Sequence, residues 1–304
     1  MKISSCIIKS FRNLFSQEVL KVIVITALPV FLFYLGVLIV FWNPIINISG
    51  ELISWIPFSI LKLNGAFFIL FFLWFLSVVV SFAFATAVFG PIFLNYLKSK
   101  YYYLYLIASI LFFSLLYAVL FISNWDFINN EVKKLLVLLP FDTVSKGVVA
   151  IVSIYIFYNL FILTLFAIIF VFAKPFLEAI KELEYGDVNI DVKEAVGFKK
   201  VLFKDILIFL GLFIFLFPLF FIPVVNIGYQ LFLWTKLYHD SFLYFVCNEY
   251  CSKKEFEEIK KHKIKTVLIA LIAASFNFLP IVNFFAPFFA VIMFFHCVME
   301  LKKS

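Results

Sequence analysis

The chain has 304 residues, of which 65% are hydrophobic and only 14% are charged, and its mean hydropathy is +1.11. This composition excludes an ordinary soluble domain and predicts a polytopic integral membrane protein. The formal net charge of +7 does not indicate a nucleic-acid partner, because the lysines gather in loops beside apolar segments, where anionic lipid head groups attract them.

Six apolar segments follow one another along the chain, at residues 19–42, 66–97, 101–123, 147–173, 206–237 and 266–299. A transmembrane helix needs about 20 apolar residues to cross about 30 Å of hydrocarbon, and the first four segments meet this requirement as single spans. The first segment begins near Val19 and lacks a small-residue cleavage site, so we expect an uncleaved span and not a signal peptide.

The first four spans contain an internal repeat. A shift of 83 positions without gaps superimposes pairs of rare residues, namely Tyr34 on Tyr117, Trp42 on Trp125, Asn47 on Asn130 and Pro57 on Pro140. We therefore expect residues 19–100 and 102–183 to be two parallel copies of a two-span unit. The predicted divisions of the chain are a first unit at 1–100, a second unit at 101–183, and a region at 184–304 that contains a polar linker and two hairpins.

The last two apolar segments are each interrupted by a proline turn. "FIPVVN" ends at Asn226 and "FLPIVN" ends at Asn283, and each turn leaves two arms that are too short to cross a bilayer alone. The polar loops at 174–205 and 238–265 carry six lysines each. Because lysine-rich loops favour the cytoplasmic side, we expect two re-entrant helical hairpins that enter from that side, with both termini in the cytoplasm.

The stretch at 197–299, with "FIPVVNIGYQLFLW", a charged linker and "FLPIVNFFAPFFAV", resembles the CysZ-type sulfate permeases and the related etoposide-induced protein family. "KPFLEAIKE" at Lys174 also resembles the end of a return span in that family. The resemblance implies two long transmembrane helices followed by two proline-turned hairpins that penetrate the bilayer partway. It also implies sulfate or a similar oxyanion as cargo and a bacterial inner membrane as location. This chain departs from the family pattern by an extra pair of spans.

The hairpin turns are the candidate binding site. An asparagine after each turn stands where the next arm should begin, and the following N–H groups would lie at the positive end of a helix dipole. The predicted anion-binding residues are Asn226, Ile227, Gly228, Asn283, Phe284 and Phe285. In the alternative interpretation, each asparagine only caps its own arm and the turns pack together.

Other polar residues suggest structural roles. Lys236, His239 and Asp240 are expected to anchor the protein at the membrane interface. His296 and Glu300 lie one helical turn apart, and we expect a snorkelling pair at the cytoplasmic boundary, with a proton-linked pair as the alternative. The sequence "SKKE" from Ser252 matches a capping box and predicts the start of a helix.

The chain lacks the usual motifs of enzymes and cofactor-binding proteins, so we expect no enzymatic activity, no cofactor, no metal and no disulfide. Two functions stay open: a permease or channel for a small oxyanion, which the resemblance implies is sulfate, and a non-transporting membrane scaffold or assembly protein. The expected partners are sulfate or a similar oxyanion and the lipid bilayer, with a homo-oligomer as an open alternative.

Overall fold

The computed structural model describes residues 3–54, 58–96, 102–138, 141–186, 197–222, 225–279 and 282–303. Every regular element in these ranges is a helix, so the expected all-α class is confirmed. The four prolines expected at bends and hairpin turns, Pro57, Pro140, Pro223 and Pro280, lie outside the described residues.

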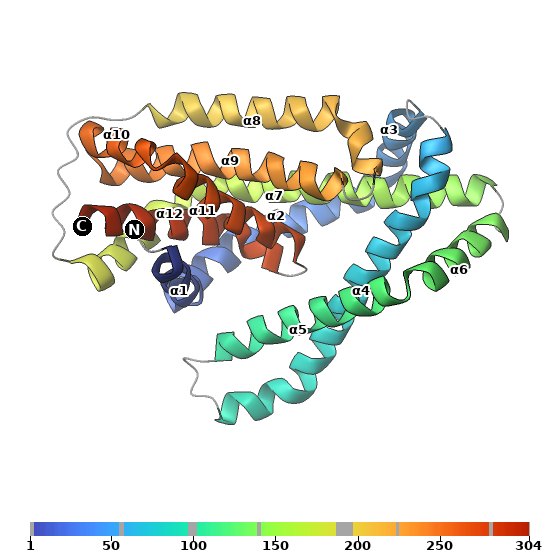
Figure 1. The fold of residues 1–304 in the computed structure, drawn as a ribbon, viewed down its shortest axis with the longest axis horizontal. Helices are drawn as coiled ribbons and strands as arrows, with labels where there is room; N and C mark the ends of the chain where they lie inside the picture. Colours follow the sequence, from blue (N-terminus) through green and yellow to red (C-terminus); the bar gives the residue numbers. More distant parts are fainter. Residues whose placement is uncertain are drawn as a thin grey trace.

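The helices of the first half are α1 Ile3–Leu14, α2 Gln17–Val40, α3 Trp42–Ser54, α4 Phe58–Tyr96, α5 Tyr102–Ser123, α6 Trp125–Leu138 and α7 Phe141–Tyr185 (Figure 1). The second half contains α8 Phe198–Phe215, the 3-10 segment η2 Phe217–Phe221, α9 Val225–Tyr250, α10 Lys253–Lys261, α11 Lys263–Ser275, the 3-10 segments η3 Phe276–Phe278 and η4 Val282–Phe285, and α12 Ala286–Lys303. Both termini lie at one end of the molecule (Figure 1).

Five helical segments in the described part of the chain are long and apolar enough to cross a membrane: Gln17–Val40, Ile69–Pro91, Leu104–Ser123, Lys146–Tyr185 and Val282–Lys302. The first four contain most of the four spans expected from the sequence, so the chain is an all-helical integral membrane protein. The fifth falls where the outgoing arm of the second hairpin was expected. The division into four full spans and two re-entrant hairpins therefore stays a prediction.

Both interrupted segments break into two helices that fold back on each other. Helix α8 ends at Phe215, the chain passes through η2, and α9 then packs along α8. In the same way, α11 ends at Ser275, η3 and η4 follow, and α12 packs along α11 (Figure 1). The breaks thus occur at the two proline-containing stretches that the sequence singled out.

Helix α9 is much longer than the sequence indicated. The apolar run stops at residue 237, and the residues after it were expected to form a polar loop, but α9 continues to Tyr250. A buried stripe explains the difference, because Tyr238, Phe242 and Val246 recur at helical spacing and are each fully buried. The predicted capping box is confirmed: Ser252 and Glu255 bond each other's backbone N–H, and α10 begins at Lys253.

The expected repeat can be followed in the helix boundaries. Trp42 is the first residue of α3 and Trp125 is the first residue of α6, while Phe58 begins α4 and Phe141 begins α7. Both pairs are separated by the offset of 83 positions found in the sequence. Figure 1 places α3 and α6 at the same end of the molecule, opposite the termini, as parallel copies require.

One hydrogen bond recurs at the same offset. The hydroxyl of Tyr34 on α2 lies 2.7 Å from Oγ1 of Thr164 on α7, and the hydroxyl of Tyr117 on α5 lies 2.7 Å from Oγ of Ser81 on α4. A shift of 83 positions carries Tyr34 to Tyr117 and Ser81 to Thr164. In each case a tyrosine on the first span of one unit contacts a hydroxyl on the second span of the other unit.

Helix packing follows the same exchanged pattern. Helix α2 packs on α7 and α5 packs on α4, while α3 packs on α7 and α6 packs on α4. Exchanging the two units converts each pairing into its counterpart, as an approximate two-fold axis would. We propose that residues 19–100 and 102–183 are duplicated units that are related in this way. The pair α4–α5 diverges from the bundle formed by α2, α7 and the hairpins (Figure 1).

The main core lies in the bundle. Every residue of α12 from 286 to 299 is buried, and α12 packs on α7, α9, α11 and α1. Helix α1 was not expected from the sequence, although Ile3, Cys6, Ile7, Ser10 and Leu14 share one face at helical spacing. The core thus positions the second hairpin between α7 on one side and α1 on the other.

Candidate functional site at the hairpin turns

The predicted residues of the first hairpin turn, Asn226, Ile227 and Gly228, lie in the first helical turn of α9. Asn226 is buried, and its backbone N–H donates to the carbonyl of Ile222 at 2.9 Å. Its side-chain oxygen accepts a hydrogen bond from Nε2 of Gln230. The expected capping role of Asn226 is therefore wrong, because α9 begins one residue earlier and Gln230 occupies the oxygen. Ile227 and Gly228 are exposed, and a Cβ added at Gly228 would meet no atom within 4 Å.

The second turn buries its asparagine more deeply. Asn283 lies in η4, is 1% exposed, and donates its backbone N–H to the carbonyl of Leu279 at 3.0 Å. Its side-chain oxygen Oδ1 accepts no hydrogen bond from the described residues, so a capping role is not observed here either. The ring of Phe284 lies 5.3 Å from that of Phe161, and the ring of Phe285 lies 6.0 Å from that of Phe15.

Helix α7 brings the two turns to one place. The ring of Tyr155 lies 5.7 Å from that of Phe220 in the first turn, and the hydroxyl of Tyr158 donates to the carbonyl of Asn277 in the second turn at 3.2 Å. The side chain of Asn283 lies near the same Tyr158 hydroxyl. Tyr155 and Tyr158 are neighbours on one face of α7, so the turns meet at this segment through aromatic side chains.

Asn277 is a polar residue of this site that the sequence reasoning missed. It is 8% exposed, and its Oδ1 accepts from the hydroxyl of Tyr238 at 3.2 Å, whereas its Nδ2 has no partner among the described residues. Most buried polar groups in proteins are hydrogen-bonded. The donor on Asn277 and the acceptor on Asn283 are thus two buried polar atoms of this turn without a partner among the described residues. An asparagine inside an apolar run was the available signal.

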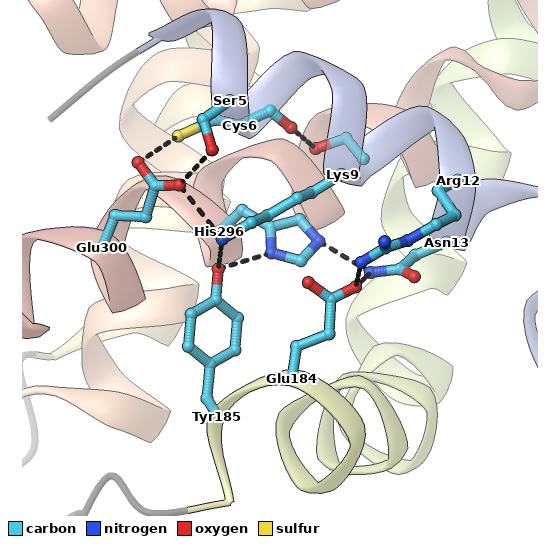
Figure 2. Close-up of polar contacts among 10 residues, drawn as sticks. Ser5, Cys6, Lys9, Arg12, Asn13, Glu184, Tyr185, His296 and Glu300 are labelled. Atoms are coloured by element: carbon cyan, nitrogen blue, oxygen red, sulfur yellow. Dashed lines mark hydrogen bonds and ion pairs between the residues drawn. The ribbon is translucent and has the colours of Figure 1, made fainter.

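A second polar cluster joins α1 to the ends of α7 and α12 (Figure 2). Nε2 of His296 lies 2.8 Å from Nδ2 of Asn13, and Nδ1 lies 2.9 Å from the hydroxyl of Tyr185. The same Nδ2 of Asn13 donates to Oε1 of Glu184 at 2.7 Å. If the side-chain amide of Asn13 were flipped, its oxygen would face the Glu184 carboxylate, where neither group could donate. The NH2 group of Asn13 therefore donates one hydrogen to Glu184 and the other to Nε2 of His296. The imidazole is therefore neutral and carries its hydrogen on Nδ1.

Two carboxylates complete this cluster. Glu300 accepts from Oγ of Ser5 at 2.7 Å and pairs with Nζ of Lys9 at 3.2 Å, while Glu184 pairs with Arg12 at 2.6 Å (Figure 2). The two cations of α1 are thus matched by one acid from α12 and one from α7.

The expectation of a snorkelling pair formed by His296 and Glu300 is wrong. His296 is 0% exposed, and the two side chains bind separate partners on α1. Those partners lie more than 280 positions away in the sequence, so the spacing of His296 and Glu300 alone could not indicate them.

A third polar cluster connects α8, α9 and α11. Asp205 is buried and accepts from Oγ of Ser241 at 3.1 Å, and burial together with the charge of Asp240 raises the pKa of Asp205 to about 6. His239 bridges Asp240 at 2.6 Å and Thr266 at 2.9 Å, and this hydrogen bond lowers the pKa of Asp240. The predicted interfacial anchor thus contains one residue, His239, that joins the first hairpin to the second through Thr266.

Comparison with known proteins gives one match. Residues 93–287 match the family model described as sulfate transporter CysZ/etoposide-induced protein 2.4. The match covers almost two thirds of the chain and includes α5, α6, α7 and both hairpin turns, and it begins near the end of α4. Searches of curated proteins and of solved structures found no match.

Proposed function

We propose that this chain, which belongs to the sulfate transporter CysZ/etoposide-induced protein 2.4 family, moves a small oxyanion across a membrane, with sulfate as the first candidate. In this proposal the membrane is the bacterial inner membrane, and the chain carries the ion without chemical change. The observation that carries the proposal is the meeting of both hairpin turns at Tyr155 and Tyr158, beside the buried and unpartnered amide nitrogen of Asn277.

The chemistry of the turns suits an oxyanion. An amide nitrogen and tyrosine hydroxyls can donate hydrogen bonds to sulfate oxygens. The backbone N–H groups of Asn226 and Asn283 already donate to the carbonyls of Ile222 and Leu279, so the side-chain donors carry this proposal. We assign the anion contacts to the first turn of α9, at Asn226, Ile227 and Gly228, and to η4, at Asn283, Phe284 and Phe285. Broken-helix transporters bind ions at such half-helix ends near the middle of the bilayer.

The hairpins are proposed to be re-entrant. At a rise of 1.5 Å per residue, the 18 residues of α8 span about 27 Å and the 13 residues of α11 span about 20 Å, both less than the roughly 30 Å of hydrocarbon. The six lysines at 174–205 and the six at 238–265 would then share the cytoplasmic side with both termini.

Cysteine labelling tests this topology. Single cysteines placed in α10 should stay unlabelled by an impermeant maleimide in intact cells and should react after permeabilisation. Labelling of α10 from outside would contradict the re-entrant arrangement.

Sulfate uptake into proteoliposomes tests the function. Asn277→Ala removes the unpartnered amide donor, and loss of one hydrogen bond to an anion, worth about 1.5–3 kcal/mol, should raise the half-saturating sulfate concentration by about 10- to 150-fold. The double variant Asn226→Ala, Asn283→Ala should also weaken uptake, because it displaces the two turns. Asn130→Ala, on the exposed surface of α6, is the matched control and should leave uptake unchanged. Wild-type uptake in the double variant would contradict the assigned site.

The scaffold function is the alternative outcome. It is favoured by the cavity between α1, the pair α4–α5 and the second hairpin, whose lining is apolar except for Thr86. No sulfate flux above that of empty vesicles with the unmodified protein would support the scaffold and contradict transport.

A further inference from the structure

A polar groove lies where the charged end of α7 meets the end of α9. Its volume is about 230 Å³, and since one water molecule needs only about 10–15 Å³ of such space, the groove can admit a ligand of several atoms. Four of its lining residues come from one face of α7 and two from the end of α9, namely Lys174, Glu178, Lys181, Glu182, Glu249 and Tyr250. The groove is separate from the hairpin turns, because Lys174 lies about 24 Å along α7 from Tyr158 at a rise of 1.5 Å per residue.

The groove begins where the hydrocarbon-spanning part of α7 ends. Residues 147–173 carry no charged side chain and exceed the roughly 20 residues that cross the hydrocarbon, and Lys174 is the first charged residue after them. The side chains of Val171 and Phe172, just before it, are exposed. The groove therefore lies at the level of the lipid head groups, next to an apolar helix surface that acyl chains can contact.

The groove carries charges of both signs that the protein leaves unpaired. Lys174 and Glu249 form an ion pair with each other at 3.0 Å. Glu178, Glu182 and Lys181 have no ion-pair partner among the described residues. Glu178 and Glu182 lie one helical turn apart, where like charges repel each other. The groove thus presents two uncompensated carboxylates beside one lysine.

The hydroxyl of Tyr250 is a buried polar group of the same groove. The residue is 4% exposed, and its hydroxyl has no hydrogen-bond partner in the part of the chain that the structure describes, although buried hydroxyls usually have one. Its ring lies 5.0 Å from that of Phe295, and its carbonyl accepts from Nζ of Lys302 at 2.6 Å, so its position is fixed. Burial and the charges of Glu178 and Glu249 raise the pKa of Tyr250, so the hydroxyl stays protonated beside the acidic part of the groove.

We propose that this groove binds the phosphoethanolamine head group of a membrane lipid. The ammonium has three N–H donors, which match the carboxylates of Glu178 and Glu182 and the hydroxyl oxygen of Tyr250, while Lys181 pairs with the phosphate. An anion alone would meet the two carboxylates, and a cation alone would meet Lys181. A metal ion is not favoured, since no group of three or more His, Cys, Asp or Glu side chains in the described ranges is arranged to hold one.

Native mass spectrometry of the delipidated full-length protein tests the head group. Dioleoyl phosphatidylethanolamine and dioleoyl phosphatidylcholine share their acyl chains, phosphate and net charge, but choline carries methyl groups in place of the N–H donors. Because the lost hydrogen bonds involve charged groups, the association constant should be at least about tenfold larger for phosphatidylethanolamine. Equal association constants for the two lipids would overturn the proposal.

Two variants assign the contacts. Glu178→Gln with Glu182→Gln alters two exposed side chains and should bring the ratio of the two association constants close to one. Tyr250→Phe retains the ring contact and removes only the hydroxyl, so it should weaken binding of phosphatidylethanolamine about fivefold and leave phosphatidylcholine unchanged.

The matched control is Glu131→Gln with Glu257→Gln, which alters two exposed acids outside the groove and should keep the wild-type ratio. The wild-type ratio in the variant of Glu178 and Glu182 would show that these carboxylates do not bind the ammonium, and the proposal would fail.

Free phosphoethanolamine distinguishes a lipid from a soluble ligand. The lipid should bind more tightly, because its acyl chains also contact the apolar surface of α7, so an equal concentration of free phosphoethanolamine should leave the bound lipid in place. Displacement at equal concentration would overturn a lipid as the source of the head group. These measurements report binding and not flux, so they hold whether or not the protein transports sulfate.

Discussion

The exchanged hydrogen bonds of the two units allow a quantitative test of the duplication. Tyr117→Phe and Ser81→Ala each remove one side of a 2.7 Å contact between α5 and α4, and Tyr34→Phe and Thr164→Val do the same between α2 and α7. Hydrogen bonds between membrane helices contribute about 0.6 kcal/mol on average and up to about 1.7 kcal/mol. Each double-mutant cycle should therefore give a coupling energy in this range.

The two tyrosine substitutions should lower the unfolding free energy by different amounts, while the two double-mutant cycles should give similar coupling energies. The hydroxyl of Tyr34 also lies 3.3 Å from the carbonyl of Leu160, which Thr164 bonds too, so Tyr34→Phe should cost more than Tyr117→Phe. The cycle subtracts this extra contact and leaves only the pairwise energy. We expect the two coupling energies to agree within about 0.5 kcal/mol.

Reversible unfolding in detergent mixtures that contain increasing SDS gives the free energies. The combination of Tyr34→Phe with Ser81→Ala is the control, because these side chains belong to different contacts and their effects should be additive. A coupling energy near zero in either true pair, or an equal coupling in the control pair, would refute the proposed equivalence of the two units.

Two further predictions concern the polar groups near the hairpins. The pKa of Asp205 is raised to about 6, mainly by burial, so its contribution to stability is complete below pH 3.8 and is lost as the pH rises through about 6. Asp205→Asn should flatten this fall in a series of unfolding midpoints at different pH, and an unchanged slope would show that Asp205 is not responsible. Ser252→Ala removes the capping box of α10 and should lower the unfolding free energy by about 1 kcal/mol. Ser252→Asp retains a cap and should lower it less. Equal losses in the two variants would rule out capping as the cause.

The sequence was most informative where a local rule determines the structure. Hydropathy located the spans, because a helix that crosses hydrocarbon must be apolar along about 20 residues. The stretches "FIPVVN" and "FLPIVN" indicated the regions of the two breaks, although α8 already ends at Phe215 and α11 at Ser275, before either stretch begins. The pairs Trp42 and Trp125, and Tyr34 and Tyr117, located equivalent helix ends and equivalent hydrogen bonds, because rare residues seldom coincide by chance.

The sequence was least informative where partners are distant. Asn226 was expected to cap α9, but capping depends on the first helical residue, which hydropathy cannot fix within one position. The extension of α9 beyond residue 237 depends on burial against other helices. His296 was assigned to an interface because it lies near a charged terminus, whereas its burial is made possible by Asn13 and Tyr185, which come from two other helices.

The contact between α1 and α12 joins helices that are synthesised at very different times. Ser5 and Glu300, which are 295 positions apart, meet in one hydrogen bond, so α12 has to be synthesised before α1 can reach its native packing. In the same way, α2 can pack against α7 only after α7 has been synthesised. Early helices therefore insert without their native neighbours, and a chain that is truncated before α12 leaves the apolar face of α1 uncovered.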